Sequence, residues 1–277
     1  MKKTERKVLL AIDIGNSTIG LGLFPDVSDS HQLLIKRVLS TPTPAEGRIR
    51  KAIRDLLAEA SESTAGNITS YQKIDMIISS VVPGLNGRVV SAAKEFCARP
   101  LILNHAVSGL KFRASSPEKI GADRIANAVA GYSLMQKPVA VIDFGTATNI
   151  TVVGRKGVFM GGAIMPGVDL MAGSLASRTA KLPRIGIGMP ETALGQDTAS
   201  AMTSGVVLGT AGAVMKILIS IEEETGLQLS LVITGGRSGT VSPFLERPHL
   251  VIPDLIFEGL RLIHKSAGGT GRTLHAA

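Results

Sequence analysis

The sequence predicts an α/β protein with two lobes, and three observations lead to that prediction. A strand–turn–strand pattern occurs twice, as VLLAIDIGNSTIGLGLF at Val8–Phe24 and as VAVIDFGTATNITVV at Val139–Val153. The two copies begin about half the chain apart in a protein of 277 residues. Further strands alternate with amphipathic helices after each copy, which is typical of mixed α/β layers. We therefore expect one lobe over residues 1–125 and a second over residues 126–277.

The first half carries β-branched runs of strand length and apolar residues at helical spacing. The expected strands are Val8–Ile14, Ile19–Phe24, Leu33–Leu39, Ile74–Ser79 and Leu101–Leu103. The expected helices are Ala45–Glu59, Asn86–Cys97 and Gly121–Met135, and the expected loops are Thr64–Ser70 and His105–Lys119.

The second half repeats this order of elements. The expected strands are Val139–Asp143, Ile150–Val153, Val158–Gly162 and Leu231–Thr234, and the expected helices are Thr198–Ile221 and Asp254–His264. The first of these helices contains Gly205, Gly209 and Gly212, so we expect it to pack closely against another element. The Gly-rich tail Ala267–Ala277 is expected to fray.

Composition and charge favour a folded globular protein whose surface is biased toward anionic small molecules. Apolar residues make up 44% of the chain and charged residues 19%, as in ordinary globular proteins. The formal net charge of +8 comes from scattered basic residues without aromatic partners, so we expect anionic small molecules and no nucleic acid.

Cysteine content and hydropathy bear on the compartment. The lone Cys97 indicates a reducing compartment, and we interpret it as a half-buried residue without chemistry. The apolar run VLLAI is too short for a signal peptide, and no stretch reaches the roughly 18 apolar residues of a membrane span. We expect a cytoplasmic protein with no membrane association.

The two repeated turns carry the chemistry that phosphate binding needs. Backbone N–H groups in a glycine-containing turn can approach a phosphate without side-chain obstruction. The aspartates at the strand ends, Asp13 and Asp143, offer hard oxygen ligands for Mg²⁺ or a monovalent cation. A single Asp-x-Gly is also common in ordinary turns, but two copies in matched strands favour a nucleotide triphosphate held in a cleft.

Two further motifs leave alternatives open. Gly121–Arg124 (GADR) at a helix start is either an acidic helix cap or an anion-binding, proton-accepting pair. Gly161–Gly167 (GGAIMPG) indicates either a backbone crossing near a ligand or tight packing alone.

Taken in order, the motifs resemble those of type III pantothenate kinases, which belong to the actin-like, sugar-kinase and heat-shock ATPase superfamily. The resemblance runs from about Val8 to Lys265. It rests on DIGNS, SSVVPGLN, GADRIANAVAGY, DFGTATN, GGAIMPG, RTAKLPR, GQDTASAMTSG, TGG and FEGLRLI.

The resemblance implies two tandem actin-like (ribonuclease H-like) lobes around a central nucleotide cleft. It implies ATP-dependent phosphorylation of pantothenate to 4'-phosphopantothenate, the first step of coenzyme A biosynthesis. It also implies ATP, Mg²⁺ and a monovalent cation (K⁺ or NH₄⁺) as cofactors, and a homodimer with the substrate site near the subunit interface.

The resemblance also implies residue roles. The first phosphate loop would be Asp13, Ile14, Gly15, Asn16, Ser17, Thr18, Ile19 and Gly20, with Thr146 as a further ATP contact. Asp123 would be the general base, and Gly121, Ala122, Asp123, Arg124 and Thr198 would contact pantothenate. Asp143 would be the ligand of the monovalent cation.

The chain departs from the family pattern in two places. Arg113–Pro117 (RASSP) replaces the usual R-Y-D-N-P, so Ala114 stands where a substrate-contacting Tyr belongs, and Thr18–Gly20 (TIG) replaces Asn-Thr-Val. Two alternatives therefore stand beside the kinase: a same-fold kinase or phosphohydrolase for another small hydroxylated substrate, and a non-catalytic regulatory relative. Intact Asp13, Asp123 and Asp143 argue against the regulator.

Overall fold

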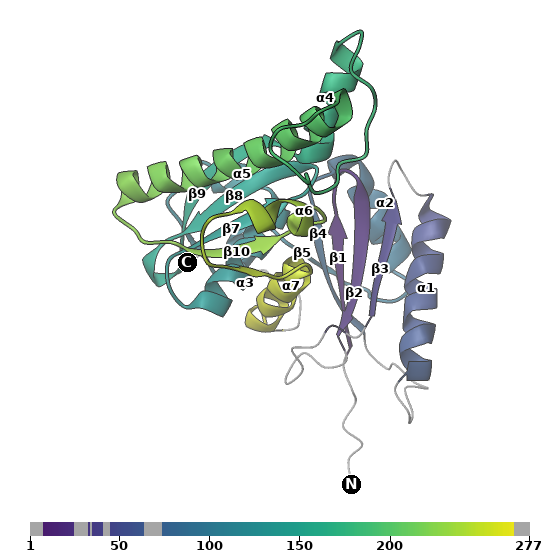
Figure 1. The fold of residues 1–277 in the computed structure, drawn as a ribbon. Coiled ribbons are helices and arrows are strands. Elements are labelled where there is room, and N and C mark those ends of the chain that lie inside the picture. Colours follow the sequence, from purple (N-terminus) through teal and green to yellow (C-terminus); the bar gives the residue numbers. More distant parts are fainter. Residues whose placement is uncertain (1–7, 25–32, 34, 41–44, 64–73, 269–277) are drawn as a thin grey trace. The chain divides into compact units, whose positions relative to one another are not determined.

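The chain folds into two compact units, which are interleaved along the sequence. The computed structural model describes residues 8–24, 33, 35–40, 45–63 and 74–268 (Figure 1). Unit 1 comprises Met1–Leu110, Ser116–Ala130 and Ile256–Ala277, and unit 2 comprises Lys111–Ser115 and Gly131–Leu255. The chain passes between the units more than once and returns to unit 1 at Ile256.

Unit 1 is built on a five-stranded sheet in the order β3-β2-β1-β4-β5. Its strands are β1 (Val8–Ile14), β2 (Thr18–Phe24), β3 (Ile35–Ser40), β4 (Ile74–Ser80) and β5 (Leu101–Ile102). β1 and β2 form an antiparallel hairpin, and β4 pairs with β1 in parallel. The carboxyl ends of β1 and β4 therefore meet at one edge of the sheet.

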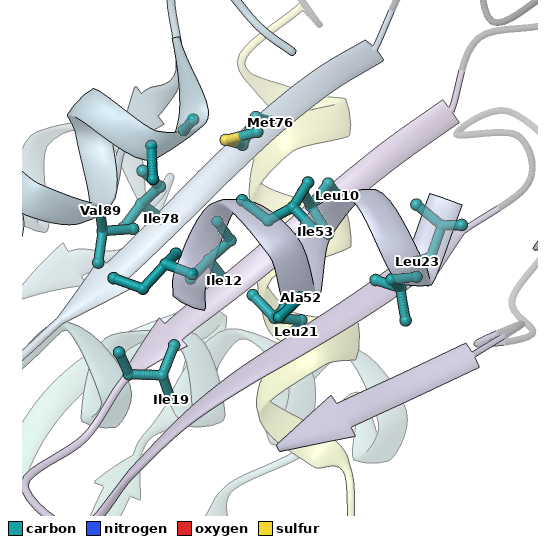
Figure 2. Close-up of a cluster of buried hydrophobic side chains, with 14 of the residues drawn as sticks. Leu10, Ile12, Ile19, Leu21, Leu23, Ala52, Ile53, Met76, Ile78 and Val89 are labelled. Atoms are coloured by element: carbon teal, nitrogen blue, oxygen red, sulfur yellow. The ribbon is translucent and has the colours of Figure 1, made fainter. Parts of the chain in front are cut away.

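One face of this sheet is covered by α1 (Glu46–Ser63) and α2 (Pro83–Ala93). Alternate side chains of β1 and β2, such as Ile12 and Leu21, pack with Ile53 of α1 and Val89 of α2 in a fully apolar cluster (Figure 2). The period-two pattern of the strands and the helical spacing of α1 thus serve the same core.

The opposite face of the unit 1 sheet contacts α7 (Leu255–Ser266) from Ile256 onward. The ring of Phe257 lies directly over Gly20 and Gly22, where a Cβ atom would collide with it. Gly259 lies against the backbone of Ala126 in α3 (Ala122–Met135). These close approaches explain why α7 packs in unit 1 from Ile256 onward.

Unit 2 repeats the topology around a six-stranded sheet in the order β11-β10-β7-β8-β9-β6. Its strands are β6 (Lys111–Phe112), β7 (Val139–Phe144), β8 (Ala147–Val153), β9 (Val158–Pro166), β10 (Ser230–Thr234) and β11 (His249–Val251). β7 and β8 are antiparallel and β10 is parallel to β7, so they correspond to β1, β2 and β4 of unit 1.

Helices α4 (Val168–Arg178), α5 (Thr198–Thr225) and α6 (Ser238–Val241) share a core with one face of the unit 2 sheet. α5, the long helix beside this sheet (Figure 1), is apolar and long enough to cross a membrane by length and composition alone. Its buried side chains, including Val207, Val214 and Leu218, pack in the apolar core of unit 2. In this structure α5 therefore acts as a core helix.

The expectation that the glycines of α5 pack closely is wrong within this chain. Gly205, Gly209 and Gly212 are exposed, and a Cβ atom at each would meet nothing within 4 Å. They lie on the helix face opposite Val207 and Val214, which are buried. Spacing alone identified a small-residue face but could not show which face is covered.

Other differences are local. The predicted helix over Asn86–Cys97 begins at Pro83 and ends at Ala93. The predicted loop His105–Lys119 contains two 3-10 turns and strand β6, which pairs with β9. Helices α4 and α6 were not predicted. The predicted loop Thr64–Ser70, Leu34 of the third strand and all but the first two residues of the tail lie outside the described residues.

Candidate active site

The first of the two repeated turns connects β1 to β2. Gly15 N–H donates to Thr18 O at 2.9 Å and closes the hairpin. Asn16, Ser17 and Thr18 are exposed at its tip, whereas Ile14 and Ile19 are fully buried in the core. The turn therefore offers its tip to a ligand, while the two isoleucines anchor it.

Asp13 lies at the end of β1, immediately before this turn, and is half-buried. Its Oδ1 accepts a hydrogen bond of 2.9 Å from Ser79 Oγ, which belongs to the neighbouring strand β4. Val81 N–H, two residues further on, donates to Ile14 O at 3.0 Å. The end of β4 thus holds both the carboxylate and the backbone that precedes the turn.

The second turn, between β7 and β8, is enclosed by glycines. Gly145 N–H donates to Ala147 O at 3.2 Å, and Gly167 N–H donates to Thr146 O at 3.1 Å. A Cβ atom at Gly167 would collide with the carbonyl oxygens of Gly145 and Thr146. The Thr146 side chain is exposed, so it is accessible to a ligand.

Asp143 of this turn is half-buried at the end of β7. A Cβ atom at Gly235, which has a φ of +93°, would collide with Oδ1 of Asp143.

Each of the two interpretations of the GGAIMPG motif fits a different glycine. Gly162 packs onto the backbone of Ile150, whereas Gly167 lies against the turn that carries Thr146.

Asp123 and Arg124 lie in the first turn of α3. Asp123 Oδ1 accepts a hydrogen bond of 2.7 Å from the backbone N–H of Arg124, and Gly121 leaves the space that this carboxylate occupies. Burial raises the pKa of Asp123 above that of an ordinary aspartate, although the hydrogen bond and the charge of Arg124 oppose the shift. A desolvated carboxylate with a raised pKa is a stronger proton acceptor than an exposed one.

Arg124 is the charge partner of this carboxylate. Burial lowers the pKa of Arg124, and the charge of Asp123 opposes that shift. A guanidinium remains protonated in proteins, so it brings a fixed positive charge and a planar set of donors to the start of α3. This pairing fits the second interpretation of the GADR motif, a proton acceptor beside an anion-binding group.

Thr198 is the first residue of α5 and is exposed. Asp197 caps this helix, because its side chain accepts from Ser200 N–H at 2.9 Å while Ser200 Oγ accepts from Asp197 N–H at 3.1 Å. The hydrogen bond from Ser200 N–H to the carboxylate is the main cause that lowers the pKa of Asp197. A cavity of about 500 Å³ lined by Met189, Glu191, Thr192, Asp197 and Thr203, among others, adjoins the same helix start.

The described residues contain no group of three or more His, Cys, Asp or Glu side chains with metal-ligand geometry. A cation beside Asp143 would therefore need water, phosphate or backbone oxygens to complete its coordination. The small residues Gly145 and Gly235 next to the Asp143 carboxylate are compatible with such ligands, because they add no side chain there.

The structure distributes the predicted residues between the two units. Unit 1 carries the first turn, from Asp13 to Gly20, together with Gly121–Arg124, and unit 2 carries Asp143, Thr146 and Thr198. Gly121 is linked to the first turn by the end of β4, because the Val81 side chain lies 3.3 Å from the Cβ position of Gly121. Ser79 lies within the SSVVPGLN motif, but the sequence alone predicts no role for it.

Arg237 of unit 2 was also missed. Its guanidinium binds Asp169 of α4, with Nε at 2.7 Å from Oδ2, and donates through Nη1 to Ile187 O at 3.0 Å. Its backbone N–H donates to Phe144 O at 3.0 Å. Arg237 thus ties the second turn to the segment that follows α4, a contact that sequence spacing does not reveal.

Comparison with known proteins gives one consistent family. Residues 9–219 match the family model described as type III pantothenate kinase. A type III pantothenate kinase from Agathobacter rectalis is 35% identical over 95% of this chain and 99% of its own length. The enzyme of the same name from Moorella thermoacetica is 34% identical over 93% and 99%.

Solved structures agree at the level of the fold. A conserved putative Baf family transcriptional activator from Campylobacter jejuni aligns with a TM-score of 0.56 and 19% identity, covering 94% of this chain and 100% of that one. The ethanolamine utilization protein EutJ from Carboxydothermus hydrogenoformans aligns with a TM-score of 0.53 and 18% identity, covering 92% and 89%. The predicted class, an α/β protein of two actin-like lobes, is confirmed.

Proposed function

The chain belongs to the type III pantothenate kinase family and phosphorylates pantothenate with ATP, and from that premise we propose which residues carry the reaction. The observation that carries the proposal is the half-buried, desolvated Asp123 carboxylate at the start of α3, with its raised pKa and its partner Arg124. We assign Asp123 as the general base.

In the proposed reaction, Asp123 accepts the proton of the primary hydroxyl of pantothenate. The hydroxyl oxygen forms a bond to the γ-phosphorus of ATP, the bond from that phosphorus to the β–γ bridging oxygen breaks, and ADP leaves with the bond's electron pair. Phosphoryl transfer depends mainly on positioning and on neutralising charge. The base therefore needs correct placement more than unusual strength.

We assign ATP binding to the two turns. The N–H groups and hydroxyls of Asn16–Thr18 are exposed and can donate to phosphate oxygens, whereas Ile14, Ile19 and Gly20 support the turn from the core. Asp13 would interact with Mg²⁺ bound to the phosphates, which neutralises the charge that develops during transfer. Thr146 would add a contact to ATP.

We assign a monovalent cation, K⁺ or NH₄⁺, to Asp143. Its carboxylate is a hard oxygen ligand at the carboxyl end of β7. The cation would supply positive charge near the phosphates without changing protonation.

We assign the pantothenate carboxylate to Arg124. A guanidinium binds a carboxylate through two parallel hydrogen bonds, which fixes the orientation of the substrate as well as its affinity. Gly121 and Ala122 would contact the substrate beside it, and Thr198 would add a hydroxyl. Ala114, where the family has Tyr, removes one wall and one hydroxyl from this pocket.

We further propose a cytoplasmic homodimer. Exposed large apolar side chains gather in unit 2 between residues 164 and 194, namely Ile164 (62% exposed), Leu170 (53%), Leu175 (36%), Met189 (61%) and Leu194 (80%). Apolar surface of this kind marks protein interfaces. The same stretch precedes Thr198, so dimer contacts and substrate contacts would share one region.

An ADP-release assay tests the proposed function. Purified protein is assayed with Mg-ATP, with and without pantothenate, in K⁺ and in Na⁺. We expect turnover that depends on pantothenate and is stimulated by K⁺. Turnover only with another small alcohol would assign a different substrate, and no turnover together with salt-sensitive DNA binding would indicate a regulatory relative.

A further inference from the structure

Ser79 lies fully buried at the carboxyl end of β4 and is 0% exposed. β4 pairs in parallel with β1, and in this register Ser79 stands beside Asp13. Its hydroxyl donates to Asp13 Oδ1 at 2.9 Å. Because the buried hydroxyl donates a hydrogen bond to the half-buried carboxylate, it restrains the rotation of that carboxylate.

The chemistry of the pair explains why this restraint matters. Asp13 ends β1 beside the first phosphate turn, and an ionised carboxylate is only an acceptor of hydrogen bonds. Hydrogen bonds to an ionised acceptor are shorter and stronger than neutral ones. One oxygen, Oδ1, accepts from Ser79, so the direction of the other is set by the strand pairing.

Val81, two residues after Ser79, also contacts the residues around the first turn. Val81 N–H donates to Ile14 O at 3.0 Å, and the Val81 side chain lies 3.3 Å from the Cβ position of Gly121, the residue that makes room for the Asp123 carboxylate. The end of β4 therefore contacts the phosphate turn on one side and the neighbour of the general base on the other.

We propose that Ser79 is a positioning residue, which orients the Asp13 carboxylate toward the Mg²⁺ bound to ATP. This inference rests on the proposed function, because it takes Asp13 as part of the ATP site. Ser79 is fully buried and would act only through Asp13. Its contribution is the hydrogen bond that holds Asp13 Oδ1 at the end of β1.

The test compares Ser79→Ala with Ser79→Thr, which keeps the hydroxyl. We expect Ser79→Ala to lower kcat/KM for Mg-ATP by roughly tenfold, the effect of losing one hydrogen bond to a charged group, and to raise the Mg²⁺ concentration needed for half-maximal ATP binding in a calorimetric titration without pantothenate. The KM for pantothenate should stay within twofold of that of the wild type, and Ser79→Thr should restore most of the Mg-ATP value.

Ser80→Ala is the matched control. Ser80 Oγ accepts from Val82 N–H at 3.2 Å, so this variant removes a neighbouring serine bond without touching Asp13. Its Mg²⁺ requirement should match that of the wild type. A Ser79→Ala enzyme with an unchanged Mg²⁺ requirement and Mg-ATP value would overturn the positioning role.

Two other outcomes separate the inference from its premise. A Ser79→Ala enzyme whose kcat/KM falls equally for Mg-ATP and for pantothenate, with no change in Mg²⁺ requirement and no rescue by Ser79→Thr, would show a purely structural serine and contradict the proposal. A wild-type protein without pantothenate-dependent turnover would instead overturn the proposed function.

Discussion

At the scale of single residues, Asp123 is defined by its surroundings more than by its type. Its carboxylate is desolvated, accepts the backbone N–H of Arg124 and occupies space that only a glycine at position 121 leaves open. Burial raises the pKa of Asp123, so the carboxylate gains proton affinity from desolvation. The same aspartate on the surface would be a weaker base.

The pH dependence of turnover should report this pKa. The base must be ionised to accept a proton, so kcat/KM for pantothenate should fall as the pH drops through the pKa of Asp123 in the free enzyme. Because that pKa lies above the ordinary aspartate value of 3.8, the acid limb should lie at a correspondingly higher pH. The measurement is a pH profile of kcat/KM for pantothenate at saturating Mg-ATP.

Asp123→Asn is the control for that profile. It should still bind ATP in a fluorescence or calorimetric titration, lose turnover by at least about a hundredfold, and show no acid limb in what remains. Normal turnover in this variant would remove Asp123 from the role of base.

Arg124→Lys tests the substrate contact. An ammonium cannot reproduce the two parallel hydrogen bonds of a guanidinium, so the KM for pantothenate should rise by roughly tenfold or more. The KM for ATP should change little. Steady-state kinetics with each substrate varied in turn measures both, and an unchanged KM for pantothenate would contradict the assignment.

At the scale of elements, close backbone approach decides which segments belong together. α7 is the last described helix of the chain, yet it packs in unit 1 because Gly259 lets it approach the backbone of α3 at Ala126, and Phe257 fills the surface left bare by Gly20 and Gly22. The packing of α7 in unit 1 therefore depends on glycine at positions 20, 22 and 259.

Gly259→Ala should destabilise the protein. The added Cβ would collide with the carbonyl of Ala126, and overpacking of this kind costs about 1–3 kcal/mol. The midpoint of thermal unfolding should fall by several degrees. Gly87→Ala in α2 is the matched control, since its Cβ would meet nothing within 4 Å, and it should stabilise by about 0.5–1 kcal/mol. Equal effects of the two substitutions would refute the packing argument.

At the scale of the whole molecule, the apolar surface between residues 164 and 194 bears on assembly. Leu194→Glu places a charge on that surface at a side chain that is 80% exposed, so it should leave the fold intact and weaken the proposed dimer. We expect a shift toward monomer in sedimentation or light-scattering measurements, together with a raised KM for pantothenate.

Leu250→Glu on β11 provides the comparison for the dimer. Leu250 is 46% exposed and belongs to unit 2, but it lies outside that surface, so its substitution should leave the assembly state unchanged. A Leu194→Glu protein that sediments like the wild type would argue against this surface as the interface.

The sequence by itself determined the repeated strand–turn–strand unit, the α/β class and the helical start of GADR. These features rest on local periodicity and on turn chemistry, which act over a few neighbouring residues. Most strands and the long helices were predicted to within a few residues for the same reason. Helix α4 and strand β6 were missed because their sequences carry weak periodicity.

Only the tertiary structure decided which distant residues meet. Ser79 donates to a carboxylate 66 positions away, and the glycines of α5 turned out to face away from the core instead of packing within it. Strand register and the direction in which a helix face points depend on contacts made across the whole fold. Sequence spacing can therefore identify a motif, but the side chain that holds its carboxylate in place is found only where β1 and β4 lie side by side.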